Sequence, residues 1–193
     1  MERVEPRLRL VPIAEADLDA VAELVNRAFG RYSDLFTGQR TSPRDYLVEA
    51  GDDARVLLVE DAAAGSLLAS SMVTAPAERF LSPDLTGPAG ANRTYVPFEA
   101  DSSHPWTGAF YYGLAGVQPA IMNRGLGRLM VERAESLAAG EGFGRIALGT
   151  VREFGLVDYY ERLGYRVVHE DAHPVGHWDF VVPHHYCEMV KDL

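Results

Sequence analysis

The sequence of 193 residues contains a single cysteine, Cys187, and this scarcity limits the covalent chemistry open to the protein. One cysteine cannot form an internal disulfide, and without a second thiol nearby it cannot build a thiolate zinc site. We interpret Cys187 as a small hydrophobic side chain in a C-terminal strand and not as a nucleophile.

Long apolar runs are also missing. No stretch approaches the roughly 20 apolar residues that a membrane helix needs. The N-terminal segment MERVEPRLRL lacks the apolar centre of a signal peptide. We therefore expect a cytoplasmic protein without a membrane partner.

Basic residues are outnumbered, with 18 Lys and Arg against 28 Asp and Glu, for a formal net charge of −10. A nucleic-acid-binding surface needs a basic stripe to replace phosphate counterions, so we expect no nucleic-acid partner. The acidic excess leaves two interpretations open, a neutral or cationic small partner or a contribution to solubility.

The remaining composition is that of an ordinary folded protein. Hydrophobic residues make up 47% and charged residues 24% of the chain, which argues against disorder and fibrous repeats. The length favours one domain over residues 1–193. Between about residues 78 and 106 the pattern is rich in Pro, Gly, Ser and Asp and has no clear periodicity, so we expect an irregular insert there, typical of a binding loop, a lid or a disordered insert.

Outside this insert, apolar periodicity predicts an alternation of strands and helices, which is typical of an α/β fold. Residues 108–117, GAFYYGLAGV, are almost uninterrupted in apolar character and predict a central strand that is buried on both faces. The other predicted strands are 8–13, 55–61, 66–76, 145–151, 165–171, 177–182 and 184–190, and the predicted helices are 15–29, 42–51, about 124–139 and 156–164.

The central strand runs into a helix through a turn that contains Gly125 and Gly127. The first N–H groups of a helix have no intrahelical partner, and the helix dipole adds partial positive charge there, so such a junction favours anions. Glycines leave room for phosphate oxygens to approach the backbone, although a tight turn with close helix packing would use them equally. A Walker loop is excluded because the chain has no Gly-Lys pair, and the dinucleotide fingerprint is excluded because Met130 stands where its third glycine belongs.

These residues resemble the cofactor motif of the GNAT superfamily of N-acetyltransferases. In that family a Val-x-Pro step precedes [Gln/Arg]-x-x-Gly-x-[Gly/Ala] at the start of a long helix; here Val117, Gln118 and Pro119 precede the segment Met122 to Gly127. Met122 departs from the family's Gln or Arg. A second match is DYYERLGYRVV, where Tyr159 and Tyr160 fall on an aromatic pair, Gly164 on a helix-ending glycine and Tyr165 on the aromatic residue before a strand.

The resemblance implies a mixed, mostly antiparallel central sheet with helices on both faces, split at the buried strand so that acetyl-CoA, as co-substrate, enters the gap. It implies that backbone amides of the helix start hold the pyrophosphate and that the strand pairs with the pantetheine arm. The residues expected to bind the cofactor are Leu114, Ala115, Val117, Met122, Asn123, Arg124, Gly125, Leu126, Gly127 and Arg128. Gly113 and Gly116 are expected to permit a bulge in this strand.

Two catalytic residues are expected. By the resemblance, Tyr160 donates its phenolic proton to the departing coenzyme thiolate, although helical spacing also fits a packing role. The strand before the cofactor turn carries no carboxylate, so we predict His104 as the general base, with Glu99 and Asp101 as alternatives.

Five of the six histidines gather near the C-terminus without a metal-ligand spacing. We expect no metal site and interpret these histidines as hairpin and strand residues that line the acceptor pocket.

The predicted function is transfer of an acetyl group from acetyl-CoA to a primary amine of a small molecule or peptide by direct attack. The insert and the acidic surface favour a cationic amine such as an aminoglycoside, a polyamine or an amino-acid derivative. The alternative is a catalytically silent acyl-CoA-binding or regulatory module, which the missing carboxylate and Met122 favour. The resemblance also makes a homodimer through the C-terminal strands a hypothesis.

Overall fold

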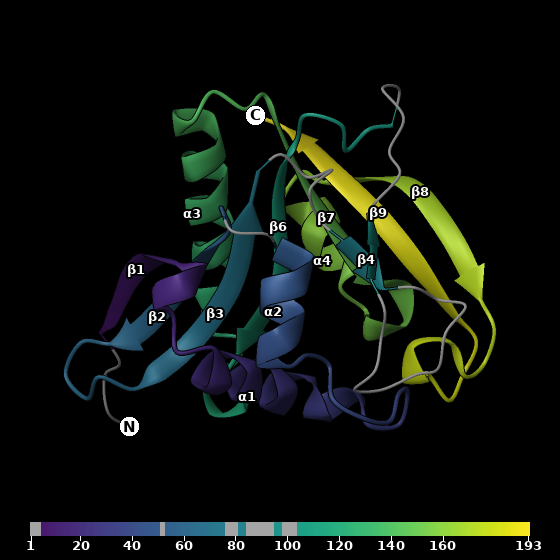
Figure 1. Ribbon diagram of the computed structural model, residues 1–193, viewed down its shortest axis with the longest axis horizontal. Coiled ribbons are helices and arrows are strands. Elements are labelled where there is room, and N and C mark those ends of the chain that lie inside the picture. Colours follow the sequence, from purple (N-terminus) through teal and green to yellow (C-terminus); the bar gives the residue numbers. More distant parts are fainter. Residues whose placement is uncertain (1–4, 51–52, 76–80, 84–94, 98–103) are drawn as a thin grey trace.

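The computed structural model describes residues 5–50, 53–75, 81–83, 95–97 and 104–193. Strands from both ends of the chain form one seven-stranded sheet in the order β1-β2-β3-β6-β7-β9-β8 (Figure 1). All neighbours pair antiparallel except β6 and β7, which are parallel, so the sheet is mixed and mostly antiparallel as predicted. The strands are β1 Pro6–Pro12, β2 Arg55–Asp61, β3 Leu67–Thr74, β6 Phe110–Val117, β7 Arg145–Val151, β8 Arg166–His173 and β9 His184–Asp192.

Helices cover both faces of the sheet (Figure 1). α1 (Leu18–Phe29) and α2 (Pro43–Ala50) pack on one face, and α3 (Leu126–Gly140) and α4 (Val157–Arg162) pack on the other. The predicted fold class is thus confirmed. None of the helices in the described part of the chain is both long enough and apolar enough to span a membrane.

Local sequence explains where the first two helices begin. Asp17 caps α1 by accepting a hydrogen bond from the Ala20 N–H at 3.1 Å. At α2, the Ser42 hydroxyl accepts from the Asp45 N–H at 3.3 Å and the Asp45 carboxylate accepts from the Ser42 N–H at 2.6 Å, a reciprocal cap that confirms Ser42 as the predicted start.

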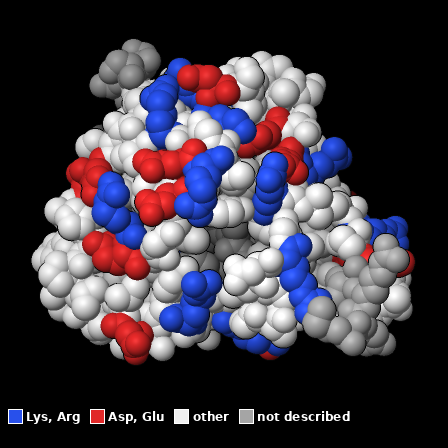
Figure 2. Space-filling view, turned by 180° about the vertical axis from the view of Figure 1, so that it is seen from behind, with Lys and Arg blue, Asp and Glu red and all other residues white. Residues whose placement is uncertain are grey.

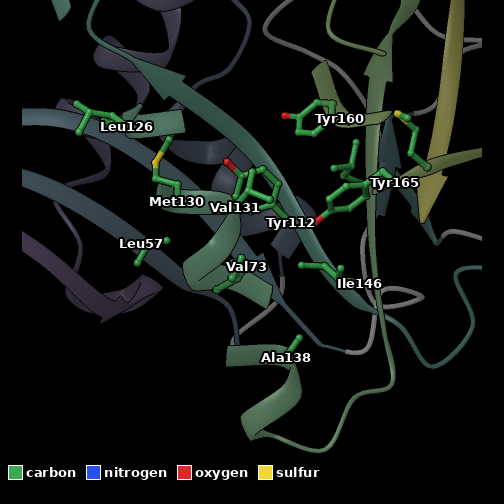
Figure 3. Packing of buried hydrophobic residues seen from close by; sticks show 14 of the residues in the cluster. Leu57, Val73, Tyr112, Leu126, Met130, Val131, Ala138, Ile146, Tyr160 and Tyr165 are labelled. Carbon is green, nitrogen blue, oxygen red and sulfur yellow. The ribbon is translucent and has the colours of Figure 1, made fainter. Parts of the chain in front are cut away.

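The core on the α3 side holds the motif helices in place. Leu126, Met130 and Val131 of α3 pack in one cluster with Tyr112 of β6 and with Tyr160 and Tyr165 around α4 (Figure 3). Gly164, in the left-handed conformation at φ +92°, ends α4 as predicted, and the Tyr165 N–H returns to the Tyr160 carbonyl at 3.1 Å.

Two expectations are corrected. The segment 177–182 is not a strand: His177–Asp179 is a 3-10 turn in which Trp178 and Asp179 have positive φ, a backbone that cannot join a ladder. The segment predicted as an irregular insert contains two short strands, β4 (Leu81–Pro83) and β5 (Tyr95–Pro97), which pair antiparallel. The alternative bases Glu99 and Asp101 lie outside the described residues, as does most of that insert.

Candidate active site

The sheet opens beside its central strand. β6 and β7 pair only at Phe110↔Ile146 and Tyr111↔Ala147, although both strands continue beyond these positions. Among the described residues, no strand pairs from Tyr112 onwards with the edge of β6 that faces away from β3. The split that the resemblance predicts is therefore present.

A bulge shapes this open edge. The register with β3 shifts between Ser70 and Met72, and Leu114 adopts φ +45°. The predicted bulge is present, but the left-handed residue is Leu114, not one of the flanking glycines. The Leu114 carbonyl accepts from the buried Tyr46 hydroxyl at 3.3 Å, which fixes the bulge from the α2 side.

Beyond the bulge, alternation decides which backbone groups face the gap. The Gln118 N–H donates to the Leu68 carbonyl of β3 at 2.8 Å. In an antiparallel ladder alternate residues face the same side, so Gly116 also faces β3, whereas Ala115 and Val117 turn their N–H and C=O groups to the open edge. The predicted strand-like pairing with a pantetheine arm needs an open backbone edge, and β6 offers one at Ala115 and Val117.

The start of α3 also has unused backbone donors. Gly125, at φ +85°, is the N-cap, and no side chain caps the helix there. Within the described part of the chain, no acceptor meets the N–H groups of Leu126, Gly127 or Arg128. A Cβ on Gly125 would stand in open space, and one on Gly127 would lie 3.3 Å from the Tyr159 hydroxyl. The two glycines therefore differ: Gly125 leaves open space beside the start of α3, while Gly127 allows Tyr159 of α4 to approach.

These donors open into a cleft, named here the glycine cleft, which lies between the start of α3, β6 and α4. The face that α3 and α4 cover is hollowed near its centre, and basic side chains stand around the hollow (Figure 2). Of the residues predicted to bind the cofactor, those that line this cleft are Ala115, Val117, Met122, Asn123, Gly125, Leu126, Gly127 and Arg128. Two of the predicted residues do not line it. Arg124 is exposed and lies outside the cleft, and Leu114 lines a second cleft, described below.

Sequence reasoning missed the contribution of the loop after α1. Arg31 lines the glycine cleft, and its Nη1 lies 3.5 Å from the Met122 sulfur. Its guanidinium also lies over the Tyr32 ring, 5.0 Å from the centroid. Met122, the departure from the family motif, is thus in contact with a cation from another element. No periodic signal marks Arg31, because it lies in a short 3-10 turn.

Tyr160 stands between two clefts. It lines the glycine cleft and a second one, named here the aromatic cleft, and it is 8% exposed. Its ring packs against Tyr159 and Tyr165, with centroids 5.2 and 5.8 Å away, and its oxygen points away from Tyr165 (Figure 3). Burial raises the pKa of Tyr160 well above its usual range, so the phenol keeps its proton at neutral pH.

The aromatic cleft is lined largely by rings from distant parts of the chain. The turn after β8 reaches it because the Thr37 N–H donates to the Asp179 carbonyl at 2.9 Å and the Val181 N–H donates to the Leu35 carbonyl at 2.9 Å. The aromatic lining residues are Phe29, Phe36, Tyr111, Tyr112, Phe154, Tyr160, Trp178, Phe180 and Tyr186. The two clefts share Phe29, Tyr112, Ala115, Leu156 and Tyr160, so they meet at the split in the sheet.

His104 lines neither cleft. Its Nδ1 accepts from the Trp106 N–H at 3.2 Å, so the ring proton belongs on Nε2, which lies 3.0 Å from the Glu188 carboxylate. Burial raises the pKa of Glu188, although His104 opposes that change. Trp106 separates this pair from Tyr111 of the aromatic cleft, with ring centroids 5.3 Å apart. The geometry therefore favours a structural role for the His104–Glu188 pair over direct proton abstraction from an acceptor by His104.

The C-terminal histidines do not line the aromatic cleft, contrary to our expectation. Three of them pack beside its lining residue Phe180: His173 stacks on His177 at 4.0 Å between centroids, and His184 stacks on Phe180 at 3.9 Å, whereas His169 and His185 pair with Asp171 and Glu153. Among the residues that the structure describes, no group of three or more potential ligands is arranged to hold a metal ion.

Comparison with known proteins agrees with the fold and with the motifs described above. Residues 89–165 match the sequence model of the acetyltransferase (GNAT) family. No curated protein matches the chain. An acyl-CoA N-acyltransferase from Pseudomonas aeruginosa is 18% identical with a TM-score of 0.61, covering 95% of this chain and 99% of its own. A GCN5-related N-acetyltransferase from Kribbella flavida is 19% identical with a TM-score of 0.58, covering 96% of this chain and 98% of its own.

A third similar structure is yncA from Salmonella typhimurium, described as an acetyltransferase "with its cofactor Acetyl-CoA". It is 15% identical with a TM-score of 0.61, and the match covers 98% of this chain and 94% of that one. At these identities the structures establish a shared fold. The family match over residues 89–165, which include the first predicted motif and the second as far as Tyr165, and the shared fold together confirm the resemblance of this chain to the GNAT superfamily of N-acetyltransferases.

Proposed function

We propose that the protein transfers an acetyl group from acetyl-CoA to a primary amine of a small molecule or peptide by direct attack. The observation that carries this proposal is the set of unused N–H groups at Leu126, Gly127 and Arg128, which open into the glycine cleft beside the free edge of β6. Main-chain donors at a helix start suit a diphosphate, and a free strand edge suits an amide-containing arm.

The residues around the cleft fit acetyl-CoA. Gly125 leaves open space beside the helix start, and Arg31 adds positive charge at the rim, where Arg128 also stands, paired with Glu132 at 2.7 Å. When bound, acetyl-CoA supplies the acetyl group as a thioester. The split between β6 and β7 then provides the passage through which an amine in the aromatic cleft reaches the glycine cleft.

Tyr160 acts as the general acid in this proposal. It lines both clefts and holds its proton at the phenol oxygen, from which it protonates the departing sulfur. Backbone N–H groups at the β6 edge polarise the carbonyl oxygen. The role of His104 as general base stays a prediction. In the structure its Nε2 contacts the Glu188 carboxylate. A cytoplasmic location and a homodimer stay predictions as well.

Calorimetry with acetyl-CoA tests the binding step. Gly125→Ala places a methyl group over the helix start, and a lost hydrogen bond to a charged group costs about 1.5 to 3 kcal/mol, so affinity falls roughly 10- to 150-fold. Gly142→Ala is the matched control, because Gly142 also has φ +85° and open surroundings but lies beyond the other end of α3. Equal binding by both variants would contradict the proposed pyrophosphate site.

One observation favours the alternative of a catalytically silent acyl-CoA-binding module. Among the described residues, the lining of both clefts includes no carboxylate and no histidine. Coenzyme A release with a panel of amines separates the two functions. Turnover that Tyr160→Phe abolishes supports the enzyme, whereas tight binding without turnover supports the module.

A further inference from the structure

The aromatic cleft has the size of a single ring. Its cavity volume is about 140 Å³. An apolar cavity of about 150 Å³ in a protein interior holds one benzene molecule. A multi-ring acceptor such as an aminoglycoside is therefore too large to be enclosed, whereas one aromatic or large aliphatic group fits.

The charge of the aromatic cleft also limits which acceptors it can bind. Among the described residues, Arg40 is the one charged residue in the lining, and no Asp or Glu stands there. The guanidinium lies over the Phe29 ring at 5.5 Å from the centroid, and no carboxylate in the described part of the chain pairs with it. Aromatic rings alone could hold a cation, but Arg40 in the same wall repels one. An unpaired guanidinium instead favours a carboxylate, which it can bind with two parallel hydrogen bonds.

The position of Arg40 limits where that carboxylate lies on the acceptor. Phe29 lines both clefts, so a guanidinium over its ring stands near their junction. The attacked amine must also be at the junction, beside Ala115 and Tyr160. In an α-amino acid the amine and the carboxylate are attached to the same carbon, and the side chain leaves it in a third direction.

We propose that the acceptor is an α-amino acid, or a close derivative, whose single aromatic or large apolar side chain fills the aromatic cleft while Arg40 binds its carboxylate. This inference rests on the proposed function and narrows it. Of the three acceptor classes that the sequence favours, it selects amino-acid derivatives and rejects polyamines and aminoglycosides.

The test compares matched acceptors by coenzyme A release. L-Phenylalanine and phenethylamine share the ring and the amine and differ in the carboxylate, and spermidine represents polyamines. We expect kcat/KM for L-phenylalanine to exceed that for phenethylamine at least tenfold and to exceed that for spermidine further. Arg40→Gln should raise KM for L-phenylalanine roughly 10- to 150-fold, the range of a lost charged hydrogen bond, and should leave KM for phenethylamine unchanged or lower it, because the repulsion of its ammonium is removed. Arg27→Gln is the control, because Arg27 pairs with Glu23 on the surface of α1 and lines neither cleft.

The outcomes separate the two proposals. Equal rates for phenethylamine and L-phenylalanine, or an Arg40→Gln effect of the same size on both, overturn the amino-acid inference and leave the transferase intact. If acetyl-CoA binds but no amine is acetylated, the transferase is overturned, and calorimetry of L-phenylalanine with coenzyme A-saturated protein decides the inference. Binding that Arg40→Gln weakens supports it, and no binding overturns it.

Discussion

Replacing Tyr160 by Phe removes one oxygen atom from the junction of the two clefts. The ring stays packed between Tyr159 and Tyr165, and the side chain is 8% exposed before the change, so we expect the free energy of unfolding to change by less than about 1 kcal/mol. A lost general acid lowers the rate roughly 10²- to 10⁴-fold. At about 1.4 kcal/mol per tenfold change, this is roughly 3 to 5 kcal/mol of transition-state stabilisation.

The assay is coenzyme A release with the best acceptor of the panel, and calorimetry of acetyl-CoA in parallel. Because burial raises the pKa of Tyr160, the acid form persists up to at least about pH 10, the ordinary value, and the wild-type rate should not fall on that account below it. Tyr165→Phe is the matched control, since Tyr165 is a buried phenol in the same cluster but lines neither cleft. A Tyr160→Phe variant that keeps more than about a tenth of the wild-type kcat would refute the acid role.

Three further predictions concern packing and titration. Gly116→Ala should destabilise the fold by about 1 to 3 kcal/mol in urea unfolding, because its Cβ would lie 3.0 Å from the Val25 Cα of α1; an unchanged midpoint would contradict this packing. Burial lowers the pKa of His177 to about 4, against about 6.5 when unfolded, so the neutral ring stabilises the fold at neutral pH and this contribution is lost as pH falls from about 6.5 to about 4. Melting temperatures should therefore fall less steeply with acid in His177→Gln than in the wild type. His104→Ala should leave Glu188 buried without its partner, at about 1 to 3 kcal/mol of stability, and lower kcat less than tenfold; a loss of a hundredfold or more would identify His104 as the base.

Patterns in the sequence predict those parts of the candidate site that are formed by residues close to one another in the chain. The apolar run of β6 and the glycines that open α3 lie within a short stretch, so the strand, the turn and the direction of the free amides follow from local rules. Tyr160 and Gly164 are likewise set by one short helix and its end. The strand predicted at 177–182 fails because its apolar residues contact the aromatic cleft from a turn, with Trp178 and Phe180 in its wall.

The amino-acid sequence by itself determined the order of most strands and helices, the glycine turn and the unused backbone N–H groups at the start of α3, because each depends on residues close in the chain. Only the tertiary structure decided what surrounds them. Arg31 and Arg40 come from the loop region after α1, and Phe180 comes from the turn after β8; none carries a periodic signal. Their place at the clefts results from the sheet order, which brings residues separated by more than a hundred positions, such as Phe36 and Phe180, into contact. The glycine turn and its unused N–H groups can therefore be predicted from the chain alone, whereas the lining of the aromatic cleft arises when distant segments pack together.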